Sequence, residues 1–428
     1  MTEQEVEIAI VGAGIAGIAV AHYLCAQHKK TSVLLIDSRQ PMSYTSAQSG
    51  DNYRNWWPHR TMTDFTNDSI DELDRFASDS NNIFNMARGG YVLATRRRDI
   101  SSFVKAIDGD IDVDVYDGQR AIQNRFPALA AAIKNVIHIR RGGDISGQQL
   151  GQYMLEKFRA ARGARLQGDV VTIDRDGRYR LGVMTPAGHD VVLADVVVNA
   201  AGPFANRIAA MLGVELPIKN IYQQKIAFED HLKVIPRDMP FSIDLDAKHL
   251  DWSTEEREML IEDPDLQYLS EEMPPGSHCR PDGGPYGQWV KLGWAYNKQI
   301  SSPQEDMVNE PAIDESFPEI VIRGAAEFIP ALRAYVTSPP PRFSHYGGYY
   351  SMTEENWPLI GPLDKHGAFV VGALSGFGSM AACAAGKLCA MHIGGAALPG
   401  YAADLSLERL DNVTLMAELK AADNRGLL

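Results

Sequence analysis

The sequence predicts an α/β protein with two domains: a Rossmann-like βαβ domain that is discontinuous in sequence, and an α+β domain built on a mixed or antiparallel sheet. The first forty residues alternate strand-like, glycine-rich and helical segments, and the chain becomes apolar and glycine-rich again after residue 343. The region between is more polar and contains separated strand candidates. We therefore assign residues 1–92, 146–216 and 343–428 to the βαβ domain, and residues 93–145 and 217–342 to the second domain, with an acidic insertion near residues 244–275.

The elements are expected in the following order. A strand at residues 7–11, a helix at 19–28 and a strand at 32–37 form the first βαβ unit. The further predictions are a helix at 69–82, a strand at 89–95, a helix at 99–107, a helix within 143–166, a strand at 168–176, a hairpin over 178–194, an apolar strand at 195–202, and strands at 223–229 and 288–297.

The composition is that of an ordinary soluble globular protein, with 45% hydrophobic and 22% charged residues. The net charge of −14 argues against a nucleic-acid partner. The four cysteines form no C-x-x-C pair, so we expect neither a disulfide framework nor a metal site. The apolar run at residues 8–24 contains three glycines and follows an acidic leader. We therefore expect no signal peptide, no membrane span and a cytoplasmic location.

The first βαβ unit carries a G-x-G-x-x-G motif at Gly12, Gly14 and Gly17, and Asp37 ends its second strand. Gly12 permits a tight turn, Gly14 lets the backbone approach a pyrophosphate, and Gly17 allows close packing of helix and strand. Asp37 would accept hydrogen bonds from a ribose, which favours FAD or NAD over NADP. Ser38 and Arg39 either reach the adenosine or form an exposed pair. The alternative to a nucleotide site is a merely tight turn.

Two later glycine blocks have the same character. Ala201 and Gly202 follow the apolar strand at 195–202, where small residues would let the backbone pass close to a flat ring. Gly376, Gly378 and Ser379 precede a helix whose first N–H groups would face an anion or a carbonyl oxygen. Each block alone is equally compatible with an ordinary turn before a helix.

In this order and spacing, the three blocks resemble the D-amino-acid oxidase superfamily of FAD-dependent oxidoreductases, most closely the sarcosine oxidase and glycine oxidase group. The resemblance also rests on Gly50-Asp51, on YGQWVKLGW and on YYSMTEENWPLIG, and it covers nearly the whole chain apart from the acidic insertion. It implies FAD as the cofactor. The residues it places at FAD are Gly12, Gly14, Ile15, Ala16, Gly17, Asp37, Ser38, Arg39, Ser46, Ser49, Val170, Ala201, Gly202, Gly376, Gly378, Ser379 and Met380.

The chain departs from the family where FAD is attached covalently. Gly348 stands where some members have a cysteine, and Ser49 stands where others have a histidine. We therefore expect FAD to be bound non-covalently, with His59 as an outside candidate for attachment.

The family's carboxylate anchors are also missing. Tyr350 replaces an arginine of glycine oxidase, and Met380 and Trp56 replace a lysine and an arginine of sarcosine oxidases. Arg54 and Arg60 either substitute for them or are structural or surface arginines. Arg54, Trp56, Trp289 and Tyr349 are accordingly predicted to bind substrate in an aromatic pocket, unless several of the aromatic residues belong to the core.

The resemblance implies oxidation of a C–N bond of an amine or N-substituted amino acid, by hydride transfer to flavin N5 and hydrolysis of the imine. Tyr350 would orient the substrate. Lys291, in a strand that places it beside Trp289 on one face, would activate oxygen unless it points to water. The sequence around Lys291 holds no neutralising carboxylate. Without the usual anchors, bulky apolar amines should be better substrates than glycine or sarcosine.

Three alternatives to this oxidase remain open in the sequence. They are a dehydrogenase of the same fold that reduces a quinone or carrier protein, a non-catalytic FAD-binding assembly protein, and an NAD-dependent dehydrogenase. The identity of the substrate, the electron acceptor, the role of the insertion and the oligomeric state are not determined by the sequence.

Overall fold

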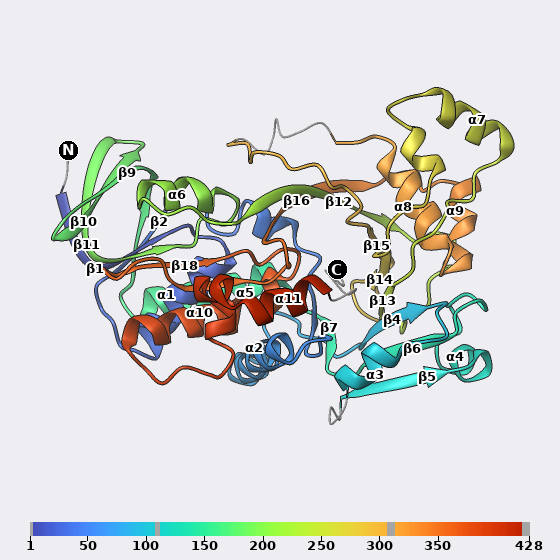
Figure 1. Ribbon diagram of the computed structural model, residues 1–428, viewed down its shortest axis with the longest axis horizontal. Helices are drawn as coiled ribbons and strands as arrows, with labels where there is room; N and C mark the ends of the chain where they lie inside the picture. The colour runs from blue at the N-terminus through green and yellow to red at the C-terminus, as the bar shows by residue number, and fades with distance from the viewer. Residues whose placement is uncertain (1–2, 108–111, 306–312, 422–428) are drawn as a thin grey trace.

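Two eight-stranded sheets dominate the computed structural model, which describes residues 3–107, 112–305 and 313–421 (Figure 1). The first sheet and its helices lie on the left of Figure 1, and the second sheet lies on the right. This confirms the predicted α/β class with a second, mixed-sheet region. No helix in these three ranges is long and apolar enough to cross a membrane.

The first sheet contains the predicted βαβ unit. Its spatial order is β17 (Leu359–Pro362), β18 (Ala368–Gly372), β11 (Gly188–Asn199), β1 (Glu3–Val11), β2 (Val33–Asp37) and β8 (Ala164–Gln167), and β9 (Asp169–Asp176) and β10 (Arg178–Thr185) extend it from β11. β1 pairs in parallel with both β2 and β11. The carboxyl ends of these strands therefore meet at one edge, where nucleotides bind in such sheets. The hairpin and the apolar strand predicted separately at 178–202 share one long strand, β11.

Four helices form a layer against this sheet: α1 (Ile15–Ala26), α2 (Arg60–Asp79), α5 (Gly147–Ala160) and α10 (Gly378–Gly394). α1 is apolar on all sides because it is buried between the sheet and its neighbouring helices. A Cβ at Gly386 would lie 2.5 Å from the backbone of Ala19, so this glycine allows α10 to approach α1 closely. α2 begins nine residues before the predicted start, at 60 rather than 69, because His59 caps it through Nδ1. The short helix α6 (Ala205–Met211) follows β11.

The second sheet is antiparallel except for the β13–β4 pair. Its order is β16 (Ser344–Met352), β12 (Lys219–Glu229), β15 (Trp289–Gly293), β14 (His278–Asp282), β13 (Phe241–Asp244), β4 (Tyr91–Thr95), β6 (Asn135–Ile139) and β5 (Val113–Asp117). α8 (Phe317–Ala326) and α9 (Ala334–Thr337) join a core with the apolar face of β12 and β15. The opposite face of β12 carries Lys225, which pairs with Gly293 and Tyr346.

A two-stranded sheet of β3 (Asn52–Arg54) and β7 (Gly142–Asp144) accompanies the two large ones. Strands β4 and β16 belong to the second sheet, although the expected boundaries at residues 92 and 343 split β4 and place β16 with the βαβ domain. The domain boundaries themselves stay a prediction. The remaining helices are α3 (Ser101–Ile107), α4 (Gln119–Arg125), α7 (Thr254–Glu262) and α11 (Val413–Ala421).

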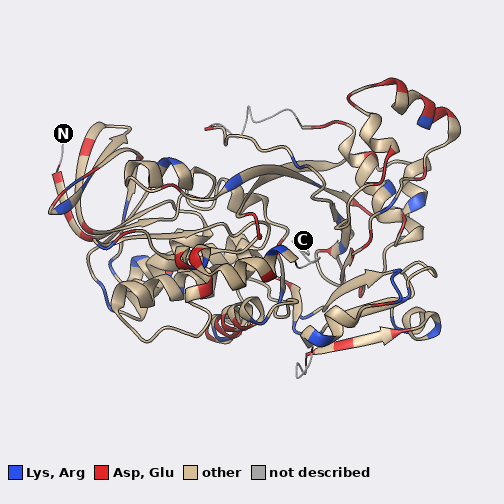
Figure 2. Ribbon diagram, viewed as in Figure 1, with Lys and Arg blue, Asp and Glu red and all other residues tan. Residues whose placement is uncertain are grey.

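The predicted acidic insertion contains α7. A capping box of Ser253 and Glu256 fixes the start of this helix. Figure 2 shows acidic residues gathered along α7.

Candidate active site

The glycine-rich loop has the geometry expected of a nucleotide-binding turn. Gly12 has φ +111°, and a Cβ there would lie 2.3 Å from the carbonyl oxygen of Ala200. A Cβ at Gly17 would lie 1.9 Å from the carbonyl oxygen of Gly12. Gly14 is the N-cap of α1 and carries no side chain to cap it, while Ser46 Oγ accepts a hydrogen bond from the Ile15 N–H at 3.0 Å. The loop thus presents a helix N-terminus to an anion.

Asp37 is fixed beside this loop by two backbone N–H groups, from Ala13 at 2.6 Å and from Arg39 at 2.8 Å. Each carboxylate oxygen accepts one of these hydrogen bonds and retains capacity for a ribose hydroxyl. The Arg39 side chain lies over the rings of Tyr44 and Phe204 and pairs with Glu305 at 2.7 Å. Ser38 accepts a hydrogen bond from Gln167 through its carbonyl.

Two adjoining cavities form one cleft along this edge of the sheet. The Asp37 cavity is lined by Gly12, Asp37, Arg39 and Ala201, and the Tyr350 cavity by Ser49, Tyr350, Gly376 and Ser379. Both are lined by Gly14, Thr45, Ser46, Ala200, Gly202 and Pro203. The shared wall means that an extended ligand can lie along both cavities.

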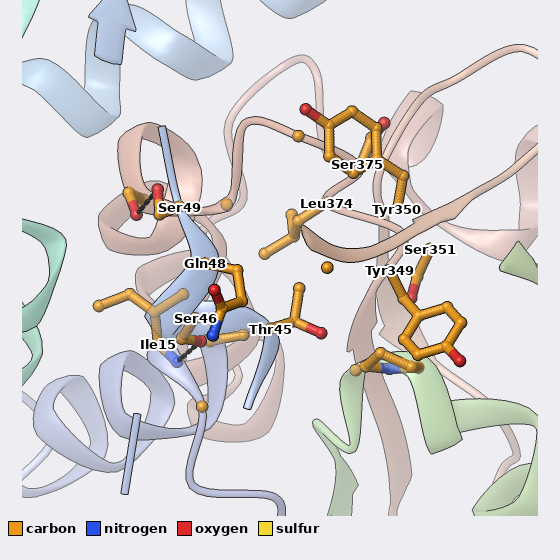
Figure 3. Close-up of a pocket in the computed structure, with 18 of the residues that line it drawn as sticks. Ile15, Thr45, Ser46, Gln48, Ser49, Tyr349, Tyr350, Ser351, Leu374 and Ser375 are labelled. Atoms are coloured by element: carbon orange, nitrogen blue, oxygen red, sulfur yellow. Dashed lines mark hydrogen bonds between the residues drawn. The ribbon is translucent and has the colours of Figure 1, made fainter. Parts of the chain in front are cut away.

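The Tyr350 cavity lies between the start of α10 and strand β16 (Figure 3). As predicted, residues 376–379 lead into a helix, and α10 begins at Gly378 without a side-chain cap. Ser379 Oγ lies 2.8 Å from Ser49 Oγ. The buried hydroxyls of Thr45 and Ser375, which also line the cavity, have no hydrogen-bond partner within the described residues. Buried polar atoms of this kind normally have a partner, so they are available to a ligand.

Tyr350 and Lys225 form the wall that comes from the second sheet. A Cβ at Gly376 would come within 2.5 Å of the Tyr350 ring, so this glycine gives the ring its place. Lys225 is 7% exposed, and its Nζ lies 5.1 Å from the centre of the same ring. Of the described residues that line the cavity, Lys225 is the one with a charged side chain. Within the described ranges no carboxylate lies within 4.0 Å of its ammonium.

Lys291 lies on the same sheet face but in a different environment. Its Nζ is 3.3 Å from Asp282 on β14, and Asp282 also pairs with Arg280 at 2.9 Å. Burial raises the pKa of the Asp51 carboxyl, and Lys291 opposes this shift. Lys291 is absent from the described lining of the Tyr350 cavity. The stretch around Lys291 holds no carboxylate, as expected, but Asp282 of the neighbouring strand β14 supplies a partner that the sequence pattern does not indicate.

Trp56 and Arg54 are not placed as substrate contacts by the structure. Trp56 lies in a buried cluster with Tyr91 and Phe103, and its indole N–H donates to the carbonyl of Ala106. Arg54 is fully buried, with its guanidinium 4.1 Å from the Trp57 ring and 4.8 Å from the Tyr91 ring. Burial lowers the pKa of Arg54 below its usual range. Both side chains are therefore buried in the core.

The other predicted substrate and anchor residues also differ in position. Tyr349 lines the Tyr350 cavity, and in Figure 3 its ring points away from that of Tyr350. Trp289 is 45% exposed at the start of β15. Arg60 is exposed and pairs with Asp64 on α2, so it does not replace the missing anchor. His59 packs against Trp357 as the cap of α2.

Two predicted FAD residues are core residues. Val170 is buried on β9 in a cluster with Leu34 and Ile36. Met380 lies in the helical core, where its carbonyl accepts a hydrogen bond from Ser69. Of the other predicted FAD residues, Ser38 and Gly17 stand behind the cleft and the rest line it.

Lys225 is the site residue that the sequence prediction missed. It stands in the predicted strand at 223–229, and alternation places it with Gln223 and Ala227 on one face. The available signal was a lysine beside the apolar residues Ile226, Ala227 and Phe228 of a predicted strand. Its position at the cavity depends on the pairing of β12 with β15 and β16, which the sequence does not specify.

Residues 7–391 match the FAD-dependent oxidoreductase family, so the chain belongs to this family and is an FAD-dependent enzyme. The NAD-dependent and non-catalytic alternatives are thereby set aside.

Solved structures of similar fold cover almost the whole chain. They include L-proline dehydrogenase from P. horikoshii, with a TM-score of 0.75 and 19% identity over 96% of this chain and 99% of that one. Glycine oxidase from Geobacillus kaustophilus gives a TM-score of 0.73 and 15% identity, over 94% and 98% of the two chains. Iminodiacetate oxidase from Chelativorans sp. BNC1 gives 0.69 and 16%, over 94% and 97%.

The residues of the cleft fit FAD. The N-terminus of α1 would face the pyrophosphate of FAD, and Asp37 would accept hydrogen bonds from its ribose. The start of α10 and the hydroxyls of Thr45 and Ser375, which line the Tyr350 cavity, would contact its ring system.

Proposed function

We propose that this enzyme oxidises a C–N bond of a small amino acid, or of a related amine that carries an anionic group. The observation that carries the proposal is Lys225, the charged residue in the described wall of the Tyr350 cavity. FAD, when bound, supplies the acceptor for the hydride equivalent. The substrate then becomes an imine, which water hydrolyses.

An anionic group in the cavity would pair with the buried ammonium of Lys225. Burying an unpaired ammonium group costs several kcal/mol, and a carboxylate brought by the substrate would offset that cost. A charge-assisted hydrogen bond of this kind contributes about 1.5–3 kcal/mol. This replaces our expectation of an uncharged pocket for apolar amines. The family's anchor positions are indeed occupied by other residues, but the cation comes from β12 instead.

Tyr350 and Lys225 would orient the substrate together. The ring of Tyr350 is held between Gly376 and the Lys225 ammonium, so its hydroxyl is presented from a fixed position. The positive charge of Lys225 would also disfavour the protonated amine. That effect helps because the nitrogen lone pair must be free when the hydride leaves.

The electron acceptor that reoxidises the enzyme is either oxygen or a quinone or carrier protein. The pairing of Lys291 with Asp282 makes Lys291 a weaker oxygen-activating group than the family resemblance implies, because its charge is neutralised and it lies outside the described cavity wall. Comparing the reoxidation rate in aerated buffer with the rate in an anaerobic solution of a soluble quinone distinguishes the two.

An anaerobic screen tests the proposed reaction. Amino acids and the amines left by removing their carboxylates are mixed with the purified enzyme, and bleaching of the flavin absorbance is recorded. We expect bleaching by some of the amino acids and at least tenfold slower bleaching by the matching amines. Bleaching only by the uncharged, bulky amines would contradict the role of Lys225, and no bleaching by any compound would contradict C–N oxidation.

A further inference from the structure

A buried arginine, Arg280, connects the second sheet to the loop that precedes β3. Arg280 lies on β14 directly opposite Lys291 of β15, so it is on the same sheet face as Lys291 and Lys225. Its side chain is 5% exposed. The Nη2 group of Arg280 donates to the carbonyl oxygen of Gly50 at 3.2 Å. Gly50 lines the Tyr350 cavity, so Arg280 acts on the wall of that cavity from behind.

Two carboxylates hold the guanidinium of Arg280 in place. Its Nη1 lies 2.9 Å from Asp282 of β14 and 3.4 Å from Asp144 of β7. Burial raises the pKa of the Asp144 carboxyl, and Arg280 opposes this shift. Because a guanidinium is a rigid planar fork, contacts that fix Nη1 also fix the direction of Nη2. The Gly50 carbonyl therefore receives its hydrogen bond from a donor whose position is set by two other strands.

The backbone of Gly50 lies against the side chain of Lys225. A Cβ at Gly50 would be 3.7 Å from Lys225 Cε, which is an ordinary van der Waals distance. The loop thus forms a side wall for the flexible four-carbon stem of the lysine. At the end of that stem, Nζ lies 5.1 Å from the centre of the Tyr350 ring. Gly50 is consequently in contact with both Arg280 and Lys225.

The neighbours of Gly50 are attached to the first sheet and its helices. Ser49 Oγ lies 2.8 Å from Ser379 Oγ at the start of α10. The carbonyl of Asp51 accepts a hydrogen bond from the N–H of Ile145 at 2.9 Å. The contact from Arg280 to Gly50 is therefore made between these two attachments, and it comes from the opposite side of the cleft.

We propose that Arg280 is a positioning residue for the anion site, because it holds Gly50 against Lys225 and so keeps the ammonium directed to the Tyr350 cavity. This inference rests on the proposed function, in which Lys225 binds the anionic group of the substrate. Without the guanidinium, the Gly50 carbonyl loses this donor and the loop can move away from the lysine stem. The ammonium would then occupy a wider range of positions, and an anion in the cavity would be bound more weakly.

A double-mutant cycle with Arg280→Met and Lys225→Met tests the inference. Propionate, a carboxylate without an amine, is titrated into each FAD-loaded protein while the flavin spectrum is recorded, and propionamide is the uncharged control. We expect Arg280→Met to weaken propionate binding about three- to thirtyfold and to leave propionamide binding unchanged. In the Lys225→Met background, Arg280→Met should have no further effect on propionate.

Two more variants complete the experiment. Arg342→Met removes an exposed arginine just before β16 and is the matched control, which should bind propionate like the wild type. Arg280→Lys keeps the charge beside Asp144 and Asp282 but not the fork, and it should show the same pattern as Arg280→Met if that variant does not fold. The flavin-to-protein absorbance ratio verifies that each variant retains FAD.

Three results would overturn the role of Arg280. They are an unchanged propionate affinity in Arg280→Met, an equal loss of propionamide binding, and an equal loss of propionate binding with and without Lys225. The last two would show that Arg280 affects the cavity as a whole or the anion directly. An unchanged propionate affinity in Lys225→Met alone would instead contradict the proposed function, and this inference with it.

Discussion

The two sides of the cleft are built in different ways. On the first sheet, the wall consists mainly of backbone: glycines at 12 and 14, the starts of α1 and α10, and one carboxylate, Asp37. On the second sheet, the wall consists of side chains, above all Lys225 and Tyr350. The first side defines the shape of a nucleotide site, and the second side determines what can lie beside it.

This difference explains why the family's glycine motifs are kept on the first side, whereas its carboxylate anchors are missing from the chain. Backbone geometry at a glycine turn tolerates few substitutions, because a Cβ there meets fixed atoms. A side chain on a sheet can be replaced by a charge from a neighbouring strand without changing the fold. In the function proposed above, Lys225 of β12 takes the place of the family's anchor in this way. The predictions below test the two sides separately.

The largest effect is expected at the backbone side, from Gly12→Ala. The added Cβ would meet the Ala200 carbonyl at 2.3 Å, at a residue whose backbone has a positive φ. We expect the free energy of unfolding to fall by about 3 kcal/mol or more, and the variant to lose its bound FAD. The flavin-to-protein absorbance ratio after gel filtration measures retention. Gly177→Ala is the control, since Gly177 also has positive φ, at +72°, but its Cβ would meet open space. If both variants retain FAD equally, close approach at Gly12 is not the reason for the glycine.

A buried histidine in helix α1, His22, should make the stability of the first-sheet region depend on pH. Burial, reinforced by Arg75, lowers the pKa of His22 from 6.5 to about 4. Between these values the unfolded chain binds a proton that the folded chain does not, so stability falls as the pH drops from about 6.5 and levels off near 4. Over this interval the free energy of unfolding should fall by about 3 kcal/mol.

Urea unfolding at pH 7.5 and pH 4.5 measures this loss. His22→Phe keeps the edge contacts with Tyr23 and Phe76, and it should reduce the shift in the unfolding midpoint. His249→Gln, at an exposed position, serves as the control and should leave the shift unchanged. An unchanged shift in His22→Phe would show that other groups cause the acid sensitivity.

Asp37→Ala should weaken FAD binding about 10- to 150-fold without unfolding the chain, because a charged acceptor contributes about 1.5–3 kcal/mol to its hydrogen bonds. Equilibrium dialysis of FAD gives the affinity, and circular dichroism checks the fold. Asp174→Ala, at an exposed residue on β9, is the control. Unchanged affinity would place Asp37 outside the ribose site.

The smallest effect is expected from Lys291→Met. Because Lys291 is ion-paired and outside the cavity wall, both flavin reduction and reoxidation should change by less than about tenfold, or 1.4 kcal/mol. Stopped-flow measurement of the two half-reactions checks this. A selective loss of reoxidation by oxygen would restore the oxygen-activating role that the family resemblance implies for Lys291.

The predictability of the site from sequence follows the same division. Gly12, Gly14, Gly17 and Asp37 were found because the turn that they form is local, and spacing alone specifies it. Lys225 was missed because its neighbours come from β15 and β16, which are distant in sequence. Trp56 was assigned to substrate from the family resemblance, whereas its side chain is buried in the core with Tyr91.

Ligand binding to the variant Lys225→Met tests the central claim most directly. Propionate, a carboxylate that cannot be oxidised at nitrogen, is titrated into the FAD-loaded enzyme while the flavin spectrum is recorded, and propionamide is the uncharged control. We expect Lys225→Met to bind propionate about 10- to 150-fold more weakly than the wild type, with propionamide binding unchanged. Equal propionate affinity in the two proteins would contradict the claim that Lys225 holds the anionic group of the substrate.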